Sequence, residues 1–157
     1  MLIRSTVPGD KTDPEGTARQ HATPCFCAGS TTDGTICRGD VHQSGTTVFV
    51  PGSEDGRTSM AGMKTDRAGR LIVASGATGK VFVYNTRTRA QLHVFATGRT
   101  DAFLNDTALV PNGDACILQV DVDLNSTPTT TTPASTTTDW SSPTDRRAPG
   151  PRPPGPR

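Results

Sequence analysis

The chain repeats itself at a period of about 45 residues, and this repeat restricts its fold more than any single motif. Residues 60–73 align with residues 104–117 without a gap. Residues 34–40 likewise align with residues 79–85, which indicates an earlier copy of the repeat. Short strands and glycine turns repeated at this spacing are typical of the four-stranded blades of a β-propeller. We therefore predict an all-β fold, a partial β-propeller of about two and a half blades.

Each predicted blade is a series of short apolar segments separated by Gly, Asn, Asp or Thr turn residues. The blades are expected at residues 14–56, 57–100 and 101–124, and residues 1–13 form a flexible lead-in. The second blade is the clearest, with strands predicted at 60–64, 70–74, 80–84 and 91–95.

The composition changes abruptly after Asn125. Residues 126–138 are almost entirely Ser, Thr and Pro, and residues 148–157 contain only Ala, Pro, Gly and Arg. Such segments cannot bury enough apolar surface to offset the conformational entropy of the chain. Residues 125–157 are therefore predicted to be a disordered tail.

The composition of the whole chain excludes several classes of partner. A net charge of +1 gives no electrostatic basis for binding nucleic acid or an anionic membrane. The chain has no apolar run near the roughly 18 residues of a spanning helix. Its apolar N-terminal stretch is too short for a secretory signal, so we expect a cytoplasmic protein with reduced cysteines.

The four cysteines fit the repeat better than they fit a zinc site. Cys25, Cys27 and Cys37 lack the paired spacing of structural zinc ligands. In the repeat, Cys25 and Cys116 take the position of Ile72, and Cys37 takes that of Phe82. We therefore predict that the cysteines are small core side chains on strands.

Two short sequences look like functional motifs but fall at turns of the repeat. Arg38-Gly39-Asp40 spells an adhesion tripeptide, yet it aligns with Val83-Tyr84-Asn85 and is predicted to be a strand end followed by a turn. Residues 76–80 look like a phosphate-binding loop, but they lack its full pattern and precede a strand. Both are predicted to be structural.

Three segments in phase with the repeat resemble one known family. They are Pro14-Glu15-Gly16, Asp66-Arg67-Ala68-Gly69-Arg70-Leu71 and Phe103-Leu104-Asn105-Asp106. Together they make the chain similar to the senescence-marker-protein/gluconolactonase (regucalcin-like) family. Members of that family are six-bladed propellers with one divalent metal in the central channel. The resemblance covers residues 14–121, about the first half of a family member.

The resemblance implies a metal site and a reaction. Glu15 matches the family's first metal ligand, and Asn105 with Asp106 matches its substrate-binding pair. The implied metal is Ca²⁺, with Zn²⁺ or Mg²⁺ as alternatives, and the implied reaction is hydrolysis of a lactone of a sugar acid. The family's later ligands and its catalytic carboxylate fall where this sequence becomes tail. Since Ca²⁺ takes about six to eight oxygen ligands, we expect a fragment that is inactive alone, with its catalytic residues unknown.

Two alternatives to an enzyme fragment stay open. The chain is either a non-catalytic propeller-like binding module or a truncated product without a selected role. An incomplete ring leaves blade faces and strand edges uncovered, so self-association through the open blade edges is also expected.

Overall fold

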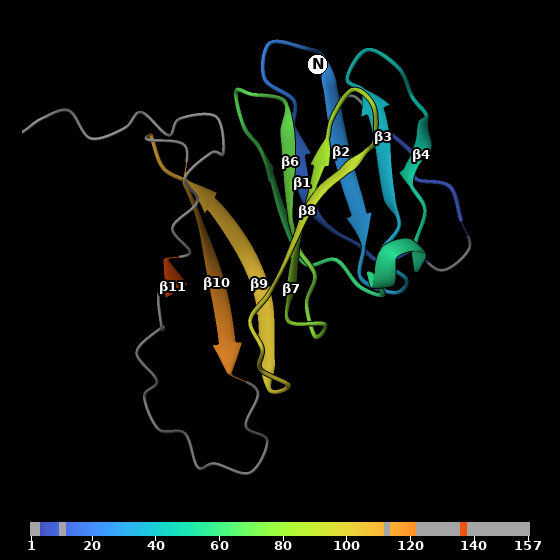
Figure 1. Ribbon diagram of the computed structural model, residues 1–157. Helices are drawn as coiled ribbons and strands as arrows, with labels where there is room; N and C mark the ends of the chain where they lie inside the picture. Colours follow the sequence, from blue (N-terminus) through green and yellow to red (C-terminus); the bar gives the residue numbers. More distant parts are fainter. Residues whose placement is uncertain (1–3, 10–11, 112–113, 122–135, 138–157) are drawn as a thin grey trace, which may run out of the picture.

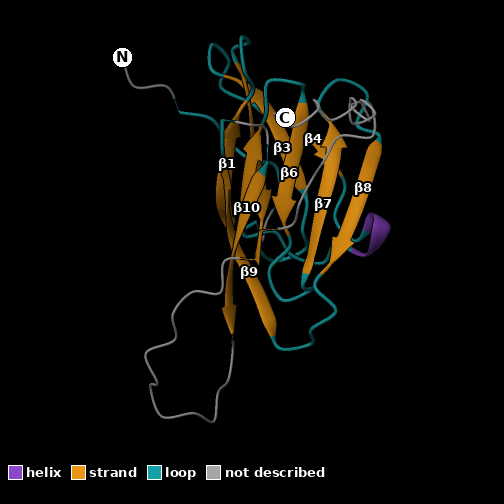
Figure 2. Cartoon of the chain, turned by 60° about the vertical axis from the view of Figure 1, so that its left-hand side comes forward, coloured by secondary structure: helices purple, strands orange, loops and turns teal. Residues whose placement is uncertain are grey.

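A computed structural model of the chain describes residues 4–9, 12–111, 114–121 and 136–137 (Figure 1). These ranges are built from β-strands in three antiparallel sheets, with one short 3₁₀ helix, η1 (Glu54–Gly56), between the first two sheets (Figure 2). None of the described residues forms a helix long and apolar enough to cross a bilayer. The predicted all-β fold is confirmed.

The first two sheets are complete four-stranded meanders in which each strand pairs with the next in the sequence. The first contains β1 (Pro14–Arg19), β2 (Cys25–Ser30), β3 (Ile36–Asp40) and β4 (Thr46–Val50). The second contains β5 (Gly62–Thr65), β6 (Arg70–Ala74), β7 (Lys80–Asn85) and β8 (Gln91–Ala96). The strands predicted for the second blade agree with β5 to β8 to within two residues at each end.

The third sheet has the order β11-β10-β9. It contains β9 (Ala102–Leu109), β10 (Ala115–Asp121) and β11 (Thr136–Thr137). The predicted tail lies outside the described residues except for β11, which pairs antiparallel with β10 at Cys116 and Ile117. In the predicted lead-in, Thr6 forms an isolated β-bridge with Gly45. The amide of Thr6 donates to the carbonyl of Ser44 over 3.1 Å, and the carbonyl of Thr6 accepts from the amide of Thr46 over 3.2 Å.

The first strands of the three sheets lie next to one another, in the order β1, β5, β9. The amide of Gly16 donates to the carbonyl of Ala61 over 3.0 Å, which joins β1 to the start of the second blade. A Cβ on Gly62 would stand 2.6 Å from the Cα of Asp106 and 2.7 Å from the carbonyl oxygen of Asn105. Glycine therefore lets these backbones approach closely, as the repeat of a propeller requires.

The main apolar core lies between the first two sheets. It is formed by buried side chains of both, which are Ala18, Cys27, Ile36, Phe49, Val50, Met60, Met63, Leu71, Val73, Phe82 and Tyr84. Cys27 and Cys37 are fully buried, as the repeat predicts, whereas Cys25 and Cys116 are half-buried. Burial raises the pKa of the Cys27 thiol to about 11, so this side chain stays a neutral thiol at physiological pH.

Candidate ligand-binding site

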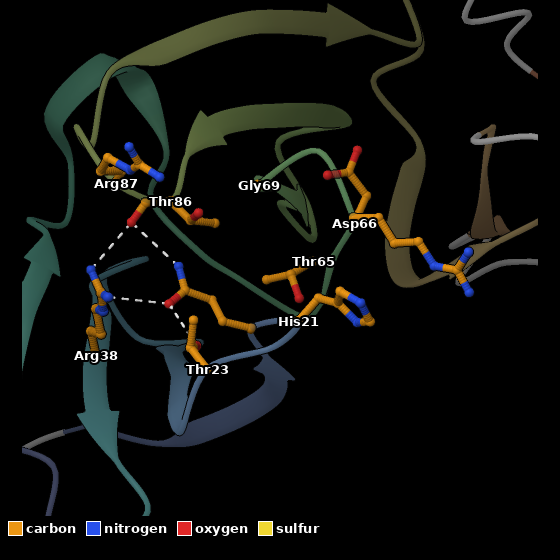
Figure 3. Close-up of a pocket in the computed structure, with 10 residues that line it drawn as sticks. His21, Thr23, Arg38, Thr65, Asp66, Gly69, Thr86 and Arg87 are labelled. Carbon is orange, nitrogen blue, oxygen red and sulfur yellow. Dashed lines mark hydrogen bonds between the residues drawn. The ribbon is translucent and has the colours of Figure 1, made fainter.

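A hollow of about 260 Å³ lies between the first two blades, at the end of the molecule where the β1–β2, β5–β6 and β7–β8 turns meet (Figure 3). Its walls are mostly polar. The first blade contributes Gln20, His21, Thr23 and Arg38. The second blade contributes Thr65, Asp66, Arg67, Gly69, Thr86 and Arg87.

One backbone carbonyl of the second blade holds two side chains of the first. Thr86 O accepts from Arg38 Nη1 at 3.2 Å and from Gln20 Nε2 at 3.4 Å. Arg38 Nη2 also donates to Gln20 Oε1 over 3.2 Å, so the three groups form a closed set of hydrogen bonds (Figure 3). Gln20 is only 6% exposed. This network joins the blades and fixes the side chains at the wall of the hollow.

Further contacts hold the Arg38 side chain in place. Its Nη2 lies 3.3 Å from Cys25 Sγ, and its guanidinium carbon lies 5.7 Å from the centre of the Phe49 ring. Thr23 Oγ1 adds a 3.4 Å hydrogen bond to Gln20 Oε1. The guanidinium is therefore oriented before any ligand arrives.

The charge of Arg38 is met only by neutral acceptors in these contacts: a carbonyl, an amide oxygen and a thiol. Other arginines in the fold are paired with aspartates. Those pairs are Arg57 with Asp55, Arg70 with Asp66, and Arg99 with Asp101. Because Asp66 is already held by Arg70 at 2.5 Å, the carboxylate in the wall does not neutralise Arg38.

The two motif look-alikes lie at the strand end and at the turn that the repeat predicts. Arg38 and Gly39 lie in β3, and the Arg38 side chain is bound in the hollow. Asp40 accepts from the amide of His42 over 2.8 Å, as a strand-ending turn requires. Residues 76–79 form the tight turn between β6 and β7, closed by a 3.3 Å bond from Gly79 N to Gly76 O, and Lys80 begins β7.

The residues that the resemblance implied for metal and substrate lie away from the hollow. Glu15 is exposed near the start of β1 and Asn105 is exposed in β9, with β5 between the two strands. Asp106 Oδ1 stands 3.6 Å from Lys64 Nζ, in an exposed pair. No group of three or more His, Cys, Asp or Glu in the described part of the chain could hold a metal ion. The residues present thus do not by themselves fit a calcium ion.

No pattern in the sequence predicted the hollow between the first two blades. One signal was available, because Arg38 stands where the second copy of the repeat has the apolar Val83. A charged residue at a core position of a repeat indicates either a buried pair or a site. The partners Gln20 and Thr86 are far away in sequence, and no local pattern connects them to Arg38.

Four-stranded meanders with their first strands side by side and their faces stacked define this chain as part of a β-propeller. Solved structures agree. The WD40 β-propeller domain of Doa1 matches 69% of this chain at 17% identity with a TM-score of 0.55, and the match covers 33% of Doa1's own chain.

Two further structures match in the same way. A protein from Lactobacillus plantarum matches 75% of this chain and 36% of its own, at 16% identity and a TM-score of 0.54. One from Bacteroides fragilis matches 74% and 33%, at 11% identity and a TM-score of 0.56. The chain thus spans about a third of the length of these structures. No family model and no curated protein matches the chain.

Proposed function

We propose that the chain is a non-catalytic binding module that holds a small polar ligand in the hollow between its first two blades. The observation that carries this proposal is the closed hydrogen-bond network of Arg38, Gln20 and the Thr86 carbonyl at the wall. Side chains fixed by one another lose little entropy when a ligand binds, so such a wall is organised in advance for binding.

The size of the hollow limits the ligand. Its volume is about 260 Å³. Pockets for drug-sized ligands usually measure about 300–1,000 Å³. The volume therefore suits a small metabolite and is too small to enclose a dinucleotide.

Protein-observed NMR with a library of small polar compounds, both neutral and charged, tests this proposal. We expect at least one compound to shift the amide signals of Gln20, Thr86 and Gly69 in a saturable way, because all three residues line the hollow. The amides of β10, in the third sheet, are an internal control and should not move. Perturbations confined to other surfaces, or none at saturating concentrations, would contradict the proposal.

A second candidate function is the one implied by the resemblance, a fragment of a metal-dependent lactone hydrolase. It is favoured by the positions of Glu15 and Asn105, both exposed on the first strands of their blades. Such a site would need oxygen ligands beyond these two side chains. A second copy of the chain is one source of these further ligands. The exposed Leu118 and Val120 of β10 provide an apolar surface for such self-association.

A lactone assay separates the two candidates. The purified chain with added Ca²⁺ or Zn²⁺ is expected to hydrolyse γ- and δ-lactones no faster than buffer, and Glu15→Gln is expected to change nothing. Glu54→Gln, in the exposed helix η1, is the matched control. Metal-dependent turnover that is lost in Glu15→Gln and kept in Glu54→Gln would contradict the binding-module proposal and support the hydrolase.

A further inference from the structure

The hollow has an uncompensated positive charge. Arg38 is half-buried, and its acceptors Thr86 O, Gln20 Oε1 and Cys25 Sγ are all neutral. These contacts use both N–H groups of Nη2 and one of Nη1, so further donors of Arg38 are the Nε–H and the second Nη1–H. A guanidinium removed from water is stabilised most by an anionic partner. The wall therefore presents a cation to whatever fills the hollow.

Two more arginines line the opening. Arg67 in the β5–β6 turn and Arg87 in the β7–β8 turn both line the hollow and are exposed. The aspartate between them in the wall, Asp66, is engaged by the Arg70 side chain and by the Arg70 amide at 2.8 Å. The opening thus adds positive charge to that of Arg38.

The exposed charges of the described residues are arranged in the same sense. Because the strands alternate in direction, the turns of these meanders fall at two opposite ends. The end with the hollow has exposed basic side chains, which are Arg19, Arg67, Arg87 and Arg89. The opposite end has mostly acidic exposed residues, which are Asp13, Glu15, Asp33, Glu54, Asp55 and Asp101, and its exposed basic residue Arg99 is paired with Asp101. Such a field raises the local concentration of anions at the hollow.

From these observations we infer that the ligand is a small oxyanion, a carboxylate or phosphate group, bound by Arg38 with Arg67 and Arg87 at the opening. This inference rests on the proposed function, because it names the ligand class of the same site. The volume admits the charged group and a few further atoms, so the ligand is an organic acid or phosphate ester of small size.

NMR titrations with inorganic phosphate, acetate and chloride at constant ionic strength test the inference. We expect saturable shifts of the Gln20 and Thr86 amides with phosphate or acetate, and none with chloride. If phosphate binds more tightly than acetate, the charged group of the ligand is a phosphate, and if acetate binds more tightly, it is a carboxylate. Arg87→Gln should weaken that binding about tenfold, since one charge-assisted hydrogen bond is lost.

Two further variants control for folding and for general charge effects. Arg99→Gln also removes one charge, but Arg99 lies in an exposed pair with Asp101 at the opposite end, so binding should stay within about twofold of wild type. Arg38→Lys keeps the charge and loses the planar guanidinium with the wall contacts that orient it, and we expect it to weaken oxyanion binding about tenfold while the thermal melt remains cooperative.

The possible failures are distinguishable. If a neutral compound binds the hollow but neither oxyanion does, the oxyanion inference is wrong and the binding module stands. If chloride produces the same shifts, or Arg87→Gln and Arg99→Gln weaken binding equally, the effect is general screening and the inference is overturned. If no compound of any charge binds, both proposals fail.

Discussion

Arg57→Met is expected to lower the free energy of unfolding by about 2–3 kcal/mol, since it removes a buried guanidinium and the hydrogen bonds that it donates. Arg57 is 0% exposed in the connection between the first two blades. Its Nε donates to Gly34 O at 2.7 Å and its Nη2 to Pro51 O at 2.8 Å. The substitution would leave both carbonyls without these donors. The loss is costly at Gly34, which is buried, and less so at Pro51, which is exposed.

The same side chain also closes a contact with the second blade. Its Nη1 is 3.4 Å from Asp55 Oδ1 and contacts the hydroxyl of Tyr84, which donates to Asp55 Oδ2 over 2.6 Å. Its guanidinium lies 5.2 Å from the Tyr84 ring centre and 5.8 Å from that of Phe82. Burial and the bond to Asp55 raise the pKa of Tyr84, so its hydroxyl stays a donor. Without Arg57, the carboxylate of Asp55, whose side chain is 19% exposed, loses its cation.

Urea denaturation of wild type and variants measures this effect, with Arg99→Met as the matched control. Arg99 pairs with Asp101 at 2.8 Å, but both side chains are about half exposed, and such surface pairs contribute about 0–1 kcal/mol. Equal losses in Arg57→Met and Arg99→Met would show that the buried network contributes no more than a surface pair.

The fold was predictable because its cause is local and repeated. Alternating apolar residues and glycine turns specify each meander, and the phase of the repeat placed Cys27 and Cys37 in the core. The same phase placed Glu15 and Asn105 on the first strands of their blades. Their proposed role in a metal site depends on ligands that the described residues do not provide, so it stays a prediction.

The contacts between blades were not predictable in the same way. Arg57 lies in a connection that the repeat leaves unspecified. Ser53 and Asp55 adopt positive φ angles of 61° and 60° there, in a region where glycine is the usual choice. The Arg38 network likewise joins residues 48 and 66 positions apart in sequence. Such contacts follow from the packing of whole sheets and not from local pattern.

Gly62→Ala is expected to separate the third sheet from the second. The added Cβ would stand 2.6 Å from the Cα of Asp106 and 2.7 Å from Asn105 O. Both are backbone atoms of β9, so no side-chain rotation relieves the overlap and the strand itself must move. Overpacking of this kind costs about 1–3 kcal/mol. We expect faster hydrogen exchange in β9 and β10 than in wild type, with β2 and β3 little changed, because the lost contact lies between β5 and β9.

Two other glycines separate this explanation from a general effect of alanine. Gly45 has no atom within 4 Å of its added Cβ and its φ is not positive, so Gly45→Ala should change stability by less than about 0.5 kcal/mol. Gly16 is the equivalent of Gly62 one blade earlier, and its added Cβ would stand 2.6 Å from Ala61 O. Gly16→Ala should therefore increase hydrogen exchange more in β1 and β5, where these strands meet, than in β10. If Gly62→Ala and Gly16→Ala both accelerate hydrogen exchange uniformly over the three sheets, the blades unfold as one unit. The close approach of the first strands would then not determine the stability of each blade separately.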